Sequence, residues 1–135
     1  MKYIKKDQLL LLLILFIPLA VYFPKMGSFA YPLRSEYSDL VITHYPNAVY
    51  IRNAILEDRS IPLWSQSIFS GYPFHADPLT GYLYPPNWIT YILPLPFAFN
   101  ALIFAHILGG SIGLYIFLRY KKLSRWSAVA GALAF

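Results

Sequence analysis

The sequence predicts a mainly α-helical, polytopic membrane protein with a long, partly helical extracytoplasmic loop between its first and second transmembrane helices. Hydrophobic residues make up 58% of the 135 residues and charged residues 13%, about half the charged share of a soluble domain. The aromatic share is 19%, and Tyr and Trp are enriched where lipid meets water. The basic residues gather beside apolar runs, so the composition predicts the lipid bilayer as a partner and no nucleic acid.

The first apolar run, residues 9–23, is short for a transmembrane helix. Its 15 residues would extend about 22 Å as a helix, whereas the hydrocarbon core of a bilayer is about 30 Å thick. Lys5 and Lys6 can reach the interface with their long side chains. The alternative is a secretory signal peptide, but its small-x-small pattern occurs only at 28–30, after Lys25. We expect an uncleaved membrane helix.

Residues 88–118 predict a short interfacial segment that leads into the second transmembrane helix. The uncharged run 97–118 has 22 residues, which is enough to cross a bilayer with some tilt. Residues 119–125 form a basic turn, and residues 126–135 begin a third apolar run that stops without a polar flank. We therefore expect the sequence to be the N-terminal part of one membrane domain, cut off inside its third helix.

Clusters of basic residues set the expected orientation, because segments rich in Lys and Arg stay in the cytoplasm. Most of the basic residues lie in two flanks: Lys2, Lys5, Lys6, Arg119, Lys121, Lys122 and Arg125. The N-terminus is then cytoplasmic, and residues 24–87 form an extracytoplasmic loop of a multi-pass protein in the inner or plasma membrane. Within that loop, Pro46 fits the first turn of a helix through residues 47–58, and Gly and Pro interrupt residues 64–87.

Short motifs follow one another through the loop. They are Ser38-Asp39-Leu40, Tyr45-Pro46, Ile61-Pro62-Leu63-Trp64, Phe69-Ser70-Gly71-Tyr72-Pro73-Phe74 and Gly81-Tyr82-Leu83-Tyr84-Pro85. Their order and spacing resemble the first outer loop of bacterial YfhO-like membrane proteins, which belong with the GT-C glycosyltransferases. The likeness continues into Ala105-His106-Ile107-Leu108-Gly109-Gly110 and covers residues 9–135. The chain departs from the family at Ser60, Ser65 and His44, where Gly, Asn and Gln are common.

The resemblance implies a multi-helix enzyme that transfers a sugar from a polyprenyl-phosphate carrier to a cell-envelope glycan or lipid acceptor on the outer face. A piece of 135 residues would lack the rest of the donor site, so we expect it to be inactive alone. The alternative is a non-enzymatic polytopic membrane protein, such as a transporter subunit or an envelope assembly factor. Transporters more often carry charges within the membrane, whereas the polar residues here gather in one outer loop.

Asp39 is the predicted catalytic residue. The resemblance places a catalytic carboxylate early in the outer loop, where it could accept the proton of a sugar hydroxyl or hold a divalent cation. The alternative is that Ser38 or Asp39 caps a helix or turn. Glu36 could add a cation ligand, although a solvated acidic pair near Arg34 is the preferred interpretation. Asp77 is the second candidate acid or cation ligand, with an Asp-Pro turn as its alternative.

Four side chains are candidates for contacting the lipid phosphate or the substrate: Arg34, His44, Arg52 and His75. Arginine binds phosphate through forked hydrogen bonds, and histidine could bind phosphate or a metal ion. Two loop histidines without a third ligand are a weak metal signal, so the sequence leaves the cofactor open, with a divalent cation as the only candidate. Arg59, beside Glu57 and Asp58, is expected on a solvated face.

The second apolar run contains a polar residue and a periodic row of small residues. His106 lies inside the run, where a polar side chain is costly, and an interhelical hydrogen bond is preferred over a chemical role. Small residues recur at every fourth position: Ala101, Ala105, Gly109 and Gly113. Such a row allows the close approach of another helix, so the sequence predicts a helix contact along it.

Overall fold

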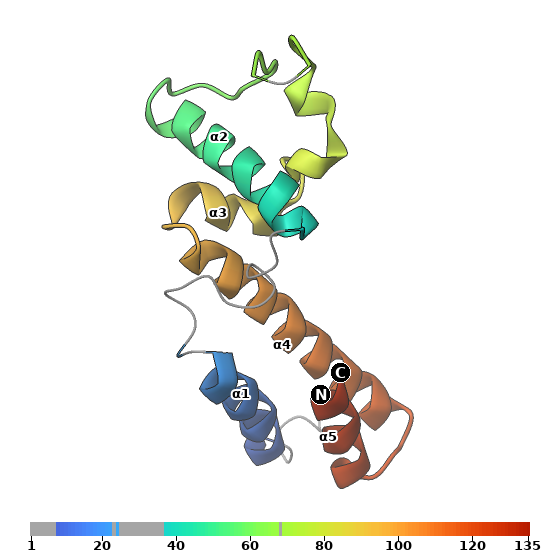
Figure 1. Ribbon diagram of the computed structural model, residues 1–135. Coiled ribbons are helices and arrows are strands. Elements are labelled where there is room, and N and C mark those ends of the chain that lie inside the picture. The colour runs from blue at the N-terminus through green and yellow to red at the C-terminus, as the bar shows by residue number, and fades with distance from the viewer. Residues whose placement is uncertain (1–7, 23, 25–36, 68) are drawn as a thin grey trace. The chain divides into compact units, whose positions relative to one another are not determined.

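The computed structural model describes residues 8–22, 24, 37–67 and 69–135 (Figure 1). These residues are mainly helical and form no strand, only an isolated antiparallel bridge between Ser65 and Tyr72. The predicted mainly α-helical fold class is therefore confirmed. The chain divides into two compact units, Gly27–Leu102 and a second that combines Met1–Met26 with Ile103–Phe135.

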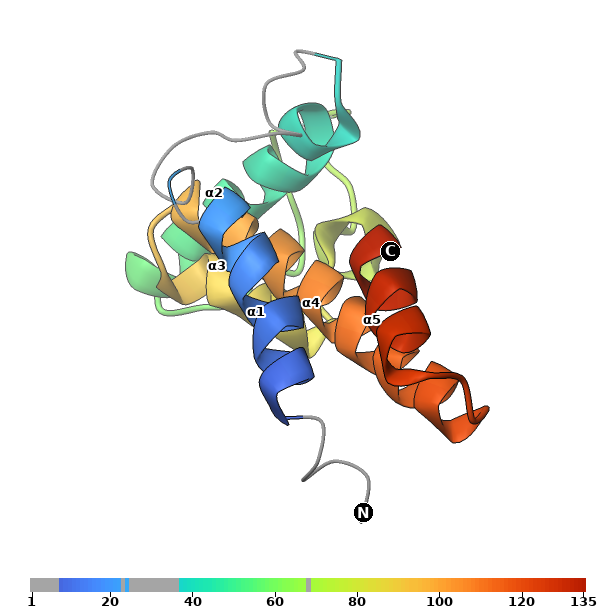
Figure 2. The same ribbon diagram turned by 90° about the horizontal axis from the view of Figure 1, so that it is seen from below.

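The unit that contains both ends of the chain is built from three helices. They are α1 (Gln8–Tyr22), the greater part of α4 (Phe97–Tyr120) and α5 (Arg125–Ala134). Figures 1 and 2 both show α5 beside the C-terminal part of α4. Their small core combines aliphatic side chains with one tyrosine and is formed by Leu10, Ile14, Tyr115, Ala128, Val129 and Ala132. The short residues of α5 allow close packing, because Ala128 and Ala132 are fully buried.

In the predicted basic turn, helix α4 ends and helix α5 begins. The amide of Lys122 bonds the carbonyl of Arg119 at 3.0 Å, and the amide of Leu123 bonds the carbonyl of Leu118 at 3.2 Å. This is the Schellman arrangement, with Lys122 in the left-handed conformation at φ 64°. The hydroxyl of Ser124 then accepts from the amide of Ser127 at 3.1 Å and caps α5.

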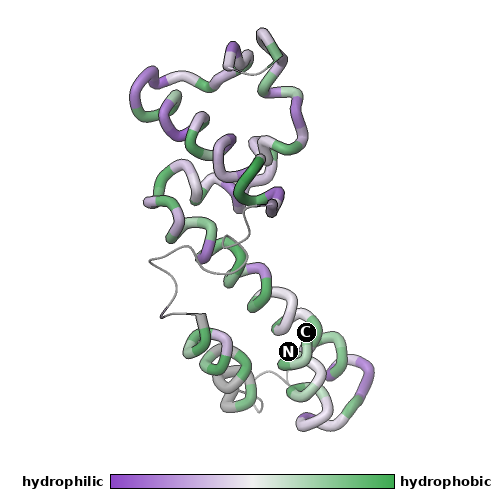
Figure 3. Tube along the Cα trace, in the orientation of Figure 1, coloured by the Kyte–Doolittle hydropathy of each residue, from purple (hydrophilic) through white to green (hydrophobic). Residues whose placement is uncertain are grey.

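α4 is the helix that matches the second predicted transmembrane segment. It has 24 residues and is long and apolar enough to cross a membrane, and Figure 3 shows hydrophobic residues along most of its length. Among the described residues no other helix has that length; α1 has 15 residues, with Pro18 inside, and α5 has 10. The number of membrane passes and the orientation stay predictions.

The other unit holds the polar and aromatic segment of the chain. Helix α2 (Tyr45–Leu56) contacts the short helix α3 (Ile89–Ile92), and Ile51, Phe74 and Tyr91 are buried together beside them. Pro46 lies in the first turn of α2, as predicted, because proline needs no amide partner there. The π-helix η3 (Leu40–His44) precedes α2 directly.

Residues 74–88 form a series of short 3-10 turns. They are η4 (Phe74–Ala76), η5 (Pro78–Thr80) and η6 (Pro85–Trp88). The backbone favours glycine at two positions of the loop motifs, since Gly71 has φ 116° and Gly81 has φ 63°. A Cβ on Gly71 would lie 2.6 Å from the Trp64 ring, and one on Gly81 would lie 2.6 Å from the Asn87 amide.

Candidate functional site

Asp39, the predicted catalytic acid, stands immediately before the π-helix η3 with an exposed side chain. Its carboxylate makes no capping hydrogen bond. The hydroxyl of Ser38 instead accepts from the amide of Leu40 at 3.2 Å. Of the two residues considered as a cap, Ser38 therefore has that role, and the carboxylate of Asp39 is not used to start the helix. Single π-helical turns occur often at functional sites.

His44, at the other end of η3, connects this helix to a turn far along the chain. Its Nδ1 atom lies 3.1 Å from the carbonyl oxygen of Leu79, and the amide of the buried Asn47 lies 3.4 Å from the same oxygen. A carbonyl oxygen only accepts hydrogen bonds, so this contact requires a proton on Nδ1. In the neutral ring, Nε2 is then an acceptor that can receive a proton or a hydrogen bond.

Asp77 forms the turn that His44 contacts. One carboxylate oxygen accepts from the amide of Leu79 at 2.8 Å, and the hydroxyl of Thr80 donates to the Asp77 carbonyl at 2.7 Å. The Asp-Pro turn considered as the alternative is therefore present. Because η3 and η5 are in contact, the structure brings together the two short helices that Asp39 and Asp77 precede, although the two residues are far apart in sequence.

A hollow of about 400 Å³ lies beside this turn. Its polar lining residues include His75, Asp77, Thr80, Tyr82 and Tyr84. The ring of His75 packs edge-to-face on Tyr82, with 4.7 Å between ring centroids. The buried Nδ1 of His75 has no hydrogen-bond partner in the part of the chain that the structure describes. This hollow therefore offers an acid, an imidazole and hydroxyl groups to a small polar ligand.

Asp77 also affects a neighbouring tyrosine. Burial raises the pKa of Tyr72, and the negative charge of Asp77 raises it further. The ring of Tyr72 packs against Phe74 with 5.9 Å between centroids. Tyr72 is thus kept protonated and can act as a hydrogen-bond donor.

The remaining candidates lie away from this turn or outside the described residues. The guanidinium of Arg52 donates one hydrogen bond to the carbonyl oxygen of Leu93 at the end of α3, so it connects two helices, and its phosphate role stays a prediction. His106 is exposed on α4. Glu36 and Arg34 lie outside the described residues. Among the described residues no three His, Asp or Glu side chains gather into a group that could hold a metal ion.

One residue of functional interest, Tyr91, was not predicted from the sequence. It is only 5% exposed, and its hydroxyl has no hydrogen-bond partner among the described residues. Burial raises its pKa, the side chain of Asn87 acts in the opposite direction, and Tyr82 raises it again. No local signal in the sequence marks it, because its burial depends on packing with Ile51 and Phe74.

Comparisons of the chain with protein-family models, with curated proteins and with solved structures gave no match. The resemblance to the YfhO-like family consequently rests on the sequence motifs alone.

Proposed function

We propose that this chain is part of a polytopic membrane glycosyltransferase of the GT-C type, which transfers a sugar from a polyprenyl-phosphate carrier to a cell-envelope acceptor. The observation that carries the proposal is the state of Asp39. Its carboxylate is exposed at the start of a π-helix, and Ser38 performs the capping that would otherwise explain an acid there. The π-helix that follows Asp39 is also joined, through His44, to the turn formed by Asp77.

In the proposed reaction Asp39 acts as a general base. It accepts the proton of the acceptor hydroxyl while that oxygen bonds to the sugar, and the bond between the sugar and the carrier phosphate breaks. The released phosphate carries away the electron pair of that bond. A positioned general base contributes about 10²–10⁴ in rate. A proton-acceptor role needs only this one carboxylate; the cation-binding alternative would need further ligands, such as Glu36, which lies outside the described residues.

The proposed location follows from the basic flanks and α4. α4 would return the chain from the outer face to the cytoplasm, where its C-terminal end meets Arg119, Lys121 and Lys122. Residues 24–87, with Asp39 near their beginning, would then lie on the outer face beside the lipid-linked donor. Further helices are needed to complete such a donor site.

The test is Asp39→Asn in the native protein, assayed in membranes for transfer of labelled sugar from a polyprenyl-phosphate donor. Asparagine keeps the size of the side chain but removes the base, so transfer should fall by about 10²-fold or more. Asp58→Asn is the matched control, because Asp58 is an exposed acid of the same unit outside the proposed site. Near-normal transfer by Asp39→Asn at equal expression would overturn the catalytic role.

A non-enzymatic assembly protein is the second candidate. It is favoured by the face of α4 that carries Gly109 and Gly113, where nothing lies within 4 Å of an added Cβ among the described residues. A helix of another subunit could pack there. No transfer activity in membranes that contain the protein at its normal level would favour this candidate.

A further inference from the structure

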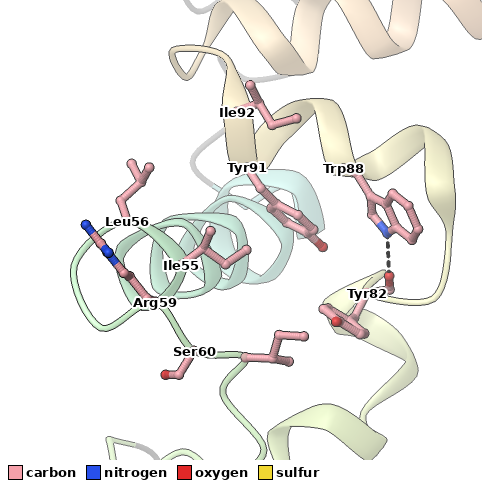
Figure 4. Close-up of a pocket in the computed structure, with 9 residues that line it drawn as sticks. Ile55, Leu56, Arg59, Ser60, Tyr82, Trp88, Tyr91 and Ile92 are labelled. Atoms are coloured by element: carbon pink, nitrogen blue, oxygen red, sulfur yellow. Dashed lines mark hydrogen bonds between the residues drawn. The ribbon is translucent and has the colours of Figure 1, made fainter.

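Two exposed surfaces of this chain are rich in hydrophobic side chains, and one of these two also carries several positive charges. The first is a hollow of about 580 Å³ in the unit Gly27–Leu102, and Figure 4 shows Ile55, Trp88 and Tyr91 around it. Its walls are mostly apolar, and such walls attract hydrocarbon groups of every kind, so they define no single ligand. The second surface is the turn between α4 and α5, where hydrophobic side chains lie beside basic ones.

The turn concentrates positive charge without an acid to balance it. Four of its seven residues are basic: Arg119, Lys121, Lys122 and Arg125. No Asp or Glu occurs in residues 78–135, and α1, the other described helix of this unit, contains none. Like charges this close together repel one another. The turn therefore attracts an anion, because a negative charge beside it would relieve the repulsion.

Contacts within the turn keep its charge beside the end of α4. The guanidinium of Arg119 donates to the carbonyl oxygen of Leu123 at 2.7 Å, which ties the turn back to the helix. The Nζ atom of Lys121 lies 5.7 Å from the centroid of the Phe117 ring, a cation–π contact. Lys122 has an exposed side chain at the left-handed position of the turn. The positive charge is therefore held next to an apolar helix by an ordered backbone.

Large aromatic side chains flank these charges. Tyr120 is 79% exposed and Trp126 is 71% exposed, and each follows an arginine directly. Tyr and Trp are enriched at the level of lipid headgroups, where Lys and Arg extend their charged ends to the headgroups along apolar surface. Figure 3 shows the turn as a hydrophilic segment directly after the hydrophobic α4. A soluble anion would leave the two rings in water, whereas a phospholipid supplies a charged headgroup together with hydrocarbon.

From these features we propose that the turn binds an anionic phospholipid of the leaflet in which α4 ends. The basic side chains pair with the negatively charged headgroup, and Tyr120 and Trp126 contact the glycerol region and the upper part of the acyl chains. Clusters of Lys and Arg directly beside a membrane helix bind anionic lipids in this way. The proposal depends on α4 crossing a membrane, but neither on sugar transfer nor on the direction in which α4 crosses.

Site-specific photocrosslinking tests the proposal, because it reports lipid at one position of the whole native protein. The crosslinking amino acid p-benzoylphenylalanine, in place of Trp126, stands at an exposed position beside the charges. The protein is reconstituted in phosphatidylcholine vesicles with increasing mole fractions of labelled phosphatidylglycerol, or with the same fractions of labelled phosphatidylcholine. We expect crosslinking to phosphatidylglycerol to saturate at low mole fraction, and crosslinking to phosphatidylcholine to rise in proportion to its mole fraction.

Charge variants of the crosslinking protein test the basic side chains. Lys121→Gln and Lys122→Gln should each raise the half-saturating mole fraction of phosphatidylglycerol about 5-fold, as expected for one cation near an anionic surface. Crosslinking to phosphatidylcholine should persist in both, which shows that the turn still lies at the membrane. Arg59→Gln is the matched control, because it removes an exposed positive charge from the other unit, and it should change nothing. Asp39→Asn should also change nothing, which separates this proposal from the catalytic one.

Three results would contradict the proposal. One is equal crosslinking to both lipids at every mole fraction, or crosslinking to neither, since the turn would then make only bulk contact or no contact with lipid. Another is an unchanged half-saturating mole fraction in both lysine variants. The third is loss of the crosslink to phosphatidylglycerol when soluble glycerol 3-phosphate is added at the same ionic strength, because the turn would then bind a phosphate from solution and not a lipid.

Discussion

The Nδ1 atom of His44 lies 3.1 Å from the carbonyl oxygen of Leu79, so a side chain of the π-helix η3 holds a turn 35 residues further along the chain. The amide of Asn47 lies 3.4 Å from the same oxygen. This contact joins the helix that begins next to Asp39 to the turn that Asp77 closes. The imidazole of His44 thus links the two elements that the candidate acids flank.

Removing that imidazole should loosen the turn. In His44→Ala the carbonyl of Leu79 keeps only the longer contact from Asn47, and losing one hydrogen bond costs about 0.5–1.5 kcal/mol. Hydrogen exchange measured by mass spectrometry should therefore become faster in residues 77–80. Asn53→Ala, an exposed change on α2, is the control and should leave exchange there as it was. Equal exchange in His44→Ala would show that the turn holds its position without His44.

Alkaline pH should destabilise the protein through Tyr91. Burial raises its folded-state pKa above the ordinary 10.0, with Asn87 opposing and Tyr82 adding to the shift. Below pH 10 both folded and unfolded states hold the proton, so the contribution of Tyr91 to stability is constant. Above that pH the unfolded state loses its proton first, and the free energy of unfolding falls until the pH passes the folded-state pKa.

Tyr91→Phe should remove this part of the alkaline loss and, at neutral pH in detergent without lipid, should stabilise the protein. The change deletes a buried hydroxyl that has no hydrogen bond of normal geometry among the described residues, although the side chain of Asn87 is near enough to lower its pKa; such a hydroxyl costs about 1–3 kcal/mol. Melting temperature measured at neutral and alkaline pH checks both effects. Tyr37→Phe changes a tyrosine that is 88% exposed and should keep the pH dependence of the parent. A lower melting temperature for Tyr91→Phe at neutral pH would mean that its hydroxyl is satisfied inside the fold.

Local signals in the sequence were enough to predict several elements. The helix expected at residues 47–58 is α2, Tyr45–Leu56, because Pro46 and helix-forming residues act within a few positions of each other. The second apolar run is α4, and the basic turn after it lies between α4 and α5. These features depend on neighbouring residues, which a sequence shows directly.

Contacts between distant segments were not predictable in the same way. Nothing in the sequence indicates that His44 contacts Leu79, that Arg52 bonds the carbonyl of Leu93, or that Ser38 rather than Asp39 caps η3. Each depends on side-chain direction after packing. Tyr91 is the clearest case, because its burial results from packing with Ile51 and Phe74, which lie far away in the sequence.

The row of small residues on α4 gives a test for a helix outside the described part of the chain. An added Cβ at Gly109 or Gly113 would meet no described atom within 4 Å. We nevertheless expect Gly109→Leu to lower the melting temperature of the native protein in detergent, because a further helix should pack on this row. Overpacking such a contact costs about 1–3 kcal/mol.

The matched control for this change is Ile116→Leu, on an exposed position of the same helix, where the volume stays constant. It should leave the melting temperature nearly unchanged. If Gly109→Leu melts at the same temperature as the parent, this face of α4 contacts lipid or detergent, and the predicted helix contact is wrong.

The orientation of the chain can be tested directly, because residues 1–135 contain no cysteine and an introduced thiol is the only one in this part of the protein. Ser60 and Lys121 are both exposed and lie on opposite sides of α4 in sequence. Lys121 is a better site than Lys122, whose φ of 64° would strain a cysteine.

The basic flanks predict that residue 60 is outside and residue 121 inside. A membrane-impermeant maleimide should therefore label Ser60→Cys in intact cells and Lys121→Cys only after permeabilisation. Labelling of both in permeabilised cells controls for thiol reactivity. An N-terminal epitope tag that stays with the mature protein would also support a membrane helix over a cleaved signal peptide. Labelling of Lys121→Cys but not of Ser60→Cys in intact cells would reverse the topology and move Asp39 away from the outer face, where the proposed reaction takes place.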